Sequence, residues 1–104
     1  MPLSTQSCVE KTEKLDTVAA EMLSTQLNDR IIINDTLEKT FRFKSFHETM
    51  AFANAVAFIA HQQDHHPDMT LSFSRCKLTW NTHSVGGLSR NDFICAARVD
   101  AIFT

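Results

Sequence analysis

Apolar and polar residues alternate with a period of two in two short runs that follow Pro67. Alternation of this kind is typical of strands with one buried face. Only Ser74 and Arg75 separate the two runs, so we predict a tight antiparallel hairpin. In its register the apolar residues oppose one another as Phe73 and Cys76, Leu71 and Leu78, and Met69 and Trp80. We expect Trp80 and Phe73 to be core aromatics.

The same register, continued past the runs, brings Pro67 opposite Thr82 and His66 opposite His83. Opposed residues of an antiparallel pair have Cβ atoms roughly 4.5–5.5 Å apart. The pattern therefore predicts that histidines from distant parts of the sequence meet at the open end of this hairpin.

An earlier hairpin is predicted from residues 31–33, which are β-branched, and residues 37–43, which alternate. Asn34-Asp35 between them is a favourable turn pair. Lys39 falls on the apolar side of its run, which indicates an edge strand or the rim of the sheet.

Helical spacing of apolar residues appears in three further segments. The first runs from Leu15 to about Leu27; Ser7 or Thr12 serves as its N-cap, and Asn28-Asp29 ends it. The second opens with a capping box at residues 45–48 and ends near Gln63 or Asp64, because Pro67 disfavours helical geometry at His66. Its broad apolar surface predicts burial on two sides, one of them against a partner subunit. The third opens at Ser89 and Asp92.

The elements then follow in the order α-β-β-α-β-β-α. Strand pairs joined by tight hairpins and separated by helices indicate an α+β fold, a four-stranded antiparallel sheet with helices packed on one face. A chain of 104 residues predicts a single domain over residues 1–104.

The composition of the chain argues against a nucleic-acid-binding protein and against a membrane protein. The net charge of −2 gives no basic surface for direct binding to nucleic acid. Three widely spaced cysteines, Cys8, Cys76 and Cys95, indicate free thiols in a reducing compartment. No signal-peptide core and no apolar run of the ~20 residues that cross a bilayer are present. We expect a soluble intracellular protein, cytoplasmic and, in a eukaryote, also nuclear.

Four of the five histidines lie between residues 61 and 92. Any one alone is more often a surface or structural histidine, but a converging set suits general acid–base chemistry, because imidazole exchanges a proton near neutral pH. A zinc site is the competing interpretation, since His61 and His65 have the spacing of helical ligands and His66 or His83 could add a third. The expected helix end between them and the missing HExxH glutamate favour acid–base chemistry, with no metal or cofactor.

These same residues resemble the signature of the pterin-4a-carbinolamine dehydratases, also known as dimerisation cofactors of a homeodomain transcription factor. The signature has a polar residue, a His-His-Pro step, an aromatic residue, a histidine and an aspartate. The matching positions here are His61, residues 65–67, Phe73, His83 and Asp92. Residues 41–46 resemble the entry to the family's long helix, and residues 87–89 its last loop, so the likeness covers roughly residues 28–104.

The resemblance implies cofactor-free dehydration of 4a-hydroxytetrahydrobiopterin, or a related 4a-hydroxytetrahydropterin, to the quinonoid dihydropterin. It implies that His65 and His83 transfer protons and that His66 holds and polarises the pterin. Other roles it implies are pocket lining by Asp64, Asn81, Thr82 and Ser84, and support from His61 and Asp92. The chain departs from the family pattern at His61, often a glutamate, and at Met69 and Trp80, which look like a compensating swap.

Two classes of function follow. The first is an enzyme, a hydro-lyase that recycles the pterin cofactor of aromatic amino acid hydroxylases, as a homo-oligomer built through its long helix or a sheet edge. The alternative is a non-catalytic protein-binding module, a dimerisation cofactor or transcriptional coactivator. Complete proton-transfer residues favour the enzyme, because a module that only binds protein does not need both His65 and His83.

Overall fold

The computed structural model describes residues 2–27 and 30–103. Its sheet has the strand order β1-β2-β4-β3, and every neighbouring pair is antiparallel. The strands are β1 (Ile31–Ile33), β2 (Thr36–Arg42), β3 (Asp68–Ser72) and β4 (Arg75–Trp80). The helices are α1 (Thr17–Ser24), α2 (Phe46–Gln63) and α3 (Arg90–Phe103), with 3-10 turns η1 (Leu3–Thr5) and η2 (His83–Val85). The predicted α+β class and the order of helices and strands are confirmed.

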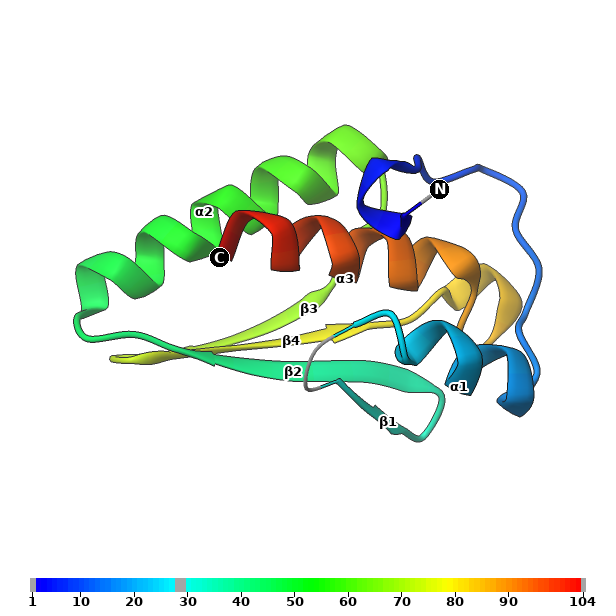
Figure 1. Cartoon of the computed structure of the whole chain (residues 1–104). Coiled ribbons are helices and arrows are strands. Elements are labelled where there is room, and N and C mark those ends of the chain that lie inside the picture. The colour runs from blue at the N-terminus through cyan, green and yellow to red at the C-terminus, as the bar shows by residue number, and fades with distance from the viewer. Residues whose placement is uncertain (1, 28–29, 104) are drawn as a thin grey trace.

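Helices α2 and α3 lie side by side over one face of the sheet, and α1 lies by the β1–β2 hairpin (Figure 1). Because side chains alternate along a strand, every second side chain of the inner strands β2 and β4 points toward the helices. Leu37 and Trp80 are Cα partners there, as are Phe41 and Cys76, and all four are buried. From above, α2 contributes Phe52 and α3 contributes further apolar residues, chiefly Phe93, Ile94 and Val99. Each such side chain contributes roughly 1.5–3 kcal/mol by leaving water.

The first hairpin turns at Asn34 and Asp35, with φ of 48° and 61°. A two-residue turn between strands needs positive φ at both positions, which Asn and Asp tolerate better than other residues with a side chain. This confirms the predicted turn.

The register predicted for the second hairpin is wrong by two residues. Met69 faces Leu78 and Leu71 faces Cys76, so the turn residues are Phe73 and Ser74. A shift of two keeps every side chain on its face, which is why Trp80 is in the core as expected. Phe73, however, lies in the turn and is 67% exposed rather than buried.

The position of Lys39 is also a correction. Its strand, β2, lies between β1 and β4 and is not an edge. Lys39 points into the helix-covered layer, where its Nζ lies 3.3 Å from Asp100 Oδ1 on α3 and 4.8 Å from the Phe41 ring centroid. A cation is tolerated on the core side because a carboxylate and an aromatic face receive it.

Both ends of α2 agree with the sequence. Ser45 Oγ accepts a hydrogen bond from the Glu48 amide, and Glu48 Oε1 accepts one from the Lys44 amide. At the other end Asp64 adopts a left-handed conformation, with φ of 51°, and its amide bonds back into the helix. The chain therefore leaves α2 just before His65, as Pro67 predicts.

The first helix is shorter than predicted. Its N-cap is Asp16, whose carboxylate accepts from the Ala19 amide, and neither Ser7 nor Thr12 caps it. The helix ends at Ser24; the predicted stop at Asn28-Asp29 lies outside the described residues.

Before α1 the chain forms only the 3-10 turn η1, and its first residues run along α3 (Figure 1). Leu3 is buried there, and Arg98 Nε donates to the Gln6 carbonyl at 2.8 Å. Val9 and the Asn91 side chain exchange two hydrogen bonds of 3.0 and 2.8 Å. We call residues 6–16 the N-terminal strap, because the bonds of Gln6 and Val9 hold it against Arg98 and Asn91 of α3.

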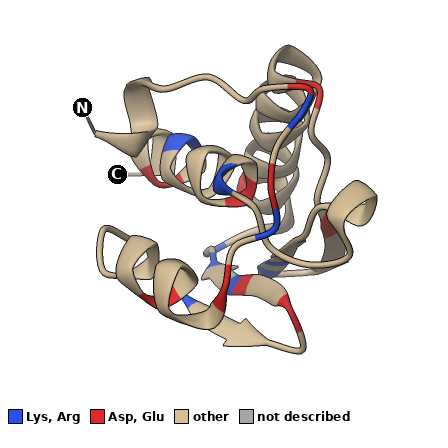
Figure 2. Ribbon diagram, turned by 90° about the vertical axis from the view of Figure 1, so that its right-hand side faces the viewer, with Lys and Arg blue, Asp and Glu red and all other residues tan. Residues whose placement is uncertain are grey.

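In this view, acidic and basic residues are interspersed along the ribbon (Figure 2). Within the described part of the chain, no helix is long and apolar enough to cross a membrane.

Candidate active site

The site is built around Asp92, which is fully buried in the first turn of α3. Its Oδ2 accepts hydrogen bonds from the Ser89 amide at 2.9 Å and from Thr82 Oγ1 at 2.8 Å. The first bond is half of the predicted capping box. The helix N-terminus carries partial positive charge, so a carboxylate is favoured at this position.

The remaining oxygen of Asp92 contacts a histidine. His65 Nε2 lies 2.6 Å from Asp92 Oδ1, and the His65 side chain is only 12% exposed. On its other side the imidazole is stacked with Trp80, with centroids 5.8 Å apart and planes at 16°. The end of α2 sets the position of His65, since its amide bonds to the Ala60 carbonyl. A short charge-assisted hydrogen bond and a stacked ring therefore fix this imidazole in one orientation.

Two opposing effects set the pKa of His65. Burial alone would lower it, but the hydrogen bond to Asp92 and the charges of Asp92, Cys8 and Asp64 outweigh burial and raise the pKa above its usual value. The imidazole is thereby kept protonated to higher pH than a free histidine, which suits a proton donor near neutral pH.

The loop after β4 completes the support. Thr82 is buried, and its hydroxyl also contacts Ser89 Oγ at 2.7 Å. The Thr82 amide donates to the Gly87 carbonyl, which closes the loop around η2. Gly86 has φ of 69°, a conformation that favours glycine, as the Gly86-Gly87 pair suggests.

A cavity of about 460 Å³ opens in front of His65. Asp64, His65, Thr82 and Ser84 line it, and all four were candidates from the sequence. The strap supplies a wall that the sequence did not reveal: Cys8, Val9, Glu10 and Thr12. The rest of the lining is Gln63 and Asn91, from the facing ends of α2 and α3.

The candidates His61, His66, Asn81 and His83 do not line this cavity. His66, His83 and His61 are exposed, and Asn81 is half-buried. In residues 2–27 and 30–103 no side-chain hydrogen bond of His66 or His83 is present. The strand pairing predicted for His66 and His83 is wrong, because the named register ends at Asp68 and Thr79 and His83 lies in η2. The structure thus joins His65 and Asp92 directly and leaves His66 and His83 exposed, outside the lining of the cavity.

Besides the rest of the cavity lining, Ser89 and Cys8 have a part in the site and were not predicted from the sequence. Ser89 bonds the Asp92–Thr82 cluster through its hydroxyl and amide, a role that its place in the capping box could have suggested. Cys8 lies far away in sequence, and no local pattern placed it at the cavity. For the zinc interpretation, no group of three or more potential ligand side chains is gathered anywhere in the described ranges.

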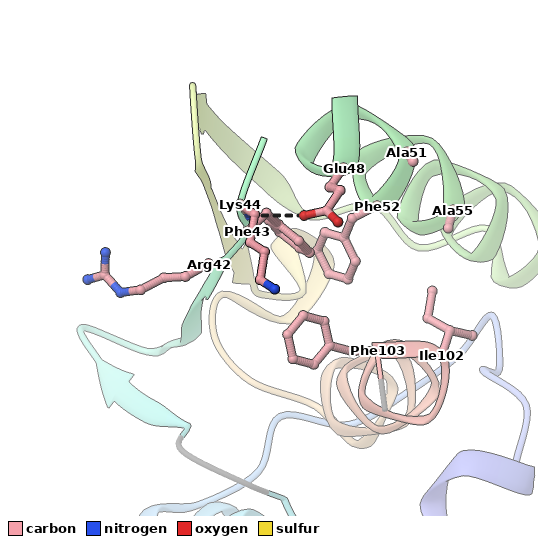
Figure 3. Close-up of a pocket in the computed structure, with 9 residues that line it drawn as sticks. All are labelled: Arg42, Phe43, Lys44, Glu48, Ala51, Phe52, Ala55, Ile102 and Phe103. Atoms are coloured by element: carbon pink, nitrogen blue, oxygen red, sulfur yellow. Dashed lines mark hydrogen bonds between the residues drawn. The ribbon is translucent and has the colours of Figure 1, made fainter. Parts of the chain in front are cut away.

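A second, larger cavity lies at the opposite end of α2 (Figure 3). This groove measures about 740 Å³. Phe43, Phe52 and Phe103 form its aromatic part, and Arg42, Lys44 and Glu48 lie at its rim (Figure 3). Ala51, Ala55 and Ile102 complete the lining.

Comparison with known proteins identifies the family. The family model for pterin 4 alpha carbinolamine dehydratase matches residues 9–102. The chain belongs to this family. A relative from Nitrosospira multiformis is 49% identical over 81 residues, which are 78% of this chain and 72% of the relative. One from Chromobacterium violaceum is 51% identical over 88 residues, 85% of this chain and 81% of the relative. Both bear the name "Putative pterin-4-alpha-carbinolamine dehydratase".

Two solved structures are similar to this fold. A transcriptional coactivator/pterin dehydratase from Brucella melitensis aligns with a TM-score of 0.83 at 25% identity, covering 86% of this chain and 98% of that one. A pterin dehydratase-like protein described as a RuBisCO assembly factor of the alpha-carboxysome aligns with a TM-score of 0.58 at 27% identity. That alignment covers 70% of this chain and 84% of the other. The family fold is therefore found in proteins with different described roles.

Proposed function

We propose that this protein dehydrates a 4a-hydroxytetrahydropterin, such as 4a-hydroxytetrahydrobiopterin, to the quinonoid dihydropterin and water. This reaction recycles the pterin cofactor of aromatic amino acid hydroxylases. The observation that carries the proposal is the His65–Asp92 pair, which faces a polar cavity in a chain of the dehydratase family.

The reaction needs one proton donated and one removed. The 4a hydroxyl leaves as water once it is protonated, and loss of the N5 proton lets its bonding pair form the C4a–N5 double bond. His65, held protonated by Asp92, is the donor to the hydroxyl. His83 takes the N5 proton, since it lies between Thr82 and Ser84, which both line the cavity.

The remaining candidates bind the pterin. Asp64 and Ser84 offer an acceptor and a hydroxyl at the cavity wall. Asn81, which is half-buried, and His66, which is exposed, would contact the pterin from outside that lining. His61, on the last turn of α2, has a supporting role only. The chemistry consists of proton transfers, so it calls for no metal or resident cofactor.

A stopped-flow measurement tests the proposal. The carbinolamine is generated in the instrument, and its ultraviolet decay is followed with wild-type protein, His83→Ala and His47→Ala. His47 is an exposed histidine in the first turn of α2, remote in sequence from the cavity, and serves as the control.

We expect wild type and His47→Ala to accelerate the decay equally, and His83→Ala to lose at least about a hundredfold, the usual contribution of an acid or base. Folded wild-type protein without acceleration would refute the enzyme. Full activity in His83→Ala would remove His83 from the chemistry.

Exposed apolar side chains on α2 and on the β3–β4 hairpin support the second candidate, a protein-binding role. Phe46 and Phe73 are stacked with centroids 6.4 Å apart, and Phe58 and Leu71 are also exposed. Strand β3 is at one end of the strand order, so it is an edge of the described sheet. An antiparallel edge can pair with its own copy about a two-fold axis, so a second copy of this chain is the expected occupant.

Light scattering tests this homo-oligomer. Phe58→Glu should convert an assembly of wild-type chains to monomers, whereas Lys77→Glu, exposed in β4, should leave it intact. Monomeric wild-type protein would exclude self-association. An inactive but folded protein that assembles would favour the alternative, a dimerisation cofactor or transcriptional coactivator.

A further inference from the structure

Two cysteine thiols meet beside the His65 cavity. Cys8, on the strap, and Cys95, on α3, have Sγ atoms 3.5 Å apart. Cys8 is part-exposed and lines the cavity, while Cys95 is fully buried behind it. Both are free thiols. The third cysteine, Cys76, is buried in β4 and is not part of this pair.

The surroundings make the two thiols unequal. The hydrogen bond from Cys95 lowers the pKa of Cys8, and the positive charges of His65 and Arg98 lower it further. Burial and the charge of Asp92 raise the pKa, but the net shift is downward. The same hydrogen bond raises the pKa of Cys95, and burial and the charges of Cys8 and Asp92 raise it further. The charge of Arg98 acts in the opposite direction but is outweighed. Cys8 is thus the better nucleophile, with a protonated thiol beside it to resolve an oxidised sulfur.

We propose that Cys8 and Cys95 are an oxidisable pair, which hydrogen peroxide or another hydroperoxide converts to a disulfide that ties the strap to α3 beside the His65 cavity. Nothing in this inference requires the dehydratase activity proposed above.

The peroxide is the oxidant that accepts the two electrons lost by the thiols. The Cys8 thiolate attacks one peroxide oxygen, the O–O bond breaks, and the products are Cys8 sulfenic acid and hydroxide, which takes up a proton to become water. The Cys95 thiol then displaces the hydroxyl from the Cys8 sulfur, which releases a second water. Two thiols lose two electrons and two protons, and one hydrogen peroxide is reduced to two waters; an organic hydroperoxide would instead give one alcohol and one water.

The strap can supply the required movement. A disulfide needs a sulfur separation of about 2.05 Å, so the thiols must approach by about 1.5 Å. Cys8 is anchored by its amide, which donates to Gln63 Oε1 at 2.8 Å, and by the neighbouring Val9–Asn91 bonds. These bonds hold the strap in place while leaving the Cys8 side chain to rotate. Its sulfur also contacts the Asn91 carbonyl at 3.6 Å, a weak bond to give up.

Oxidation of the two thiols should change the pKa of His65. The charged groups that raise the pKa of His65 are Asp92, Cys8 and Asp64. A disulfide has no negative charge, so the contribution of Cys8 is lost while those of Asp92 and Asp64 remain. The pKa of His65 should therefore fall on oxidation and recover on reduction.

Peptide mapping tests the bond itself. Trypsin should release residues 1–11 and 91–98, each with one cysteine of the pair, and residues 76–77 with the third. After mild peroxide the two longer peptides should appear joined, about 2 Da lighter than their sum, and reductant should separate them. Cys76→Ser should give the same linkage and serves as the matched control.

Three results would overturn the pairing: both thiols still free after peroxide, a linkage through Cys76, or a linkage between two chains. Because the test uses wild-type protein, it does not depend on the folding of a cysteine variant.

Fluorescence tests the effect on His65. Trp80 is the only tryptophan and the chain has no tyrosine, so the emission reports on the ring stacked with His65. A protonated imidazole quenches tryptophan, and the pH midpoint of quenching follows the pKa of His65. We expect a lower midpoint in the oxidised protein and in Cys8→Ser than in reduced wild type and Cys76→Ser. Equal midpoints in oxidised and reduced wild type would refute the coupling.

Discussion

Helix α2 has a cavity at each end, and the larger of the two is not the one with the hydrogen-bonded histidine. The groove at its N-terminal end is the larger, about 740 Å³ against 460 Å³, and aromatic rings form much of its wall. The cavity at its C-terminal end is smaller, but the imidazole that lines it is hydrogen-bonded to a buried carboxylate.

The carboxylates show the contrast most clearly. In the groove, Glu48 is exposed and bonds the Lys44 amide, so its role is to cap α2. Behind the smaller cavity, Asp92 accepts from Ser89 and Thr82 and orients His65. The carboxylate at one end of the helix thus serves as a cap, and the carboxylate at the other end also raises the pKa of a histidine. The proposed reaction therefore belongs to the smaller cavity, and the size of the groove is not an argument against it.

The largest expected effect is on stability at the aromatic end. Phe52 is buried, with its ring centroid 4.6 Å from that of Phe41 and 5.1 Å from that of Phe43. Phe52→Ala should cost about 3–5 kcal/mol of unfolding free energy. Denaturant titration checks this against Gln62→Ala, exposed on the same helix, which should stay within about 0.5 kcal/mol. An unchanged stability in Phe52→Ala would mean that the groove end is not a packed core.

Blocking each cavity in turn should separate them in function. Ser84→Trp adds bulk at the mouth of the smaller cavity, and Ala51→Trp adds the same side chain at the groove; both positions are exposed. We expect kcat/KM for dehydration to fall by roughly a hundredfold in the first, because the pterin is displaced from His65. The second should behave as wild type. The reverse result would place the reaction in the groove.

The Asp92–His65 pair at the smaller cavity should make the free energy of unfolding depend on pH. Because Asp92 raises the pKa of His65, the stabilisation from the pair is complete below about pH 6.5 and is lost as pH rises through the raised value. Asp92→Asn should lower that pKa and flatten the dependence. Unfolding titrations across this range and the Trp80 quenching midpoint both check it. An unchanged midpoint in the variant would mean that Asp92 does not control His65.

The smallest expected effect concerns the start of α2. Ser45→Ala removes the acceptor for the Glu48 amide and should cost about 1 kcal/mol. Ser7→Ala, at an exposed position of the strap, is the control and should change stability by less than about 0.5 kcal/mol. Equal stabilities of the two variants would show that the cap adds nothing measurable.

Local chemistry explains what the sequence could predict. Ser45, Asn34-Asp35 and Pro67 act within a few residues of themselves, and the structure has each of these features as predicted. Alternation fixes which face a side chain occupies but cannot distinguish registers that differ by two, so Trp80 was placed correctly and Phe73 was not.

Long-range contacts explain what it could not. Lys39 is stabilised on an inner strand by Asp100, which is distant in the sequence. Cys8 reaches the cavity because the strap crosses α3, and no periodic pattern marks such a path. His65, Asp92 and Thr82 were singled out as candidates, but the sequence did not reveal that His65 alone among the histidines is buried against Asp92.

The most direct test of the site is the single-turnover decay of 4a-hydroxytetrahydropterin with His65→Ala and with His47→Ala, after both are shown to be folded. The account predicts that His65→Ala loses at least about a hundredfold of the acceleration, since the proton donor is gone, and that His47→Ala loses none. Wild-type acceleration by folded His65→Ala would contradict it, because the buried His65–Asp92 pair would then have no part in the reaction.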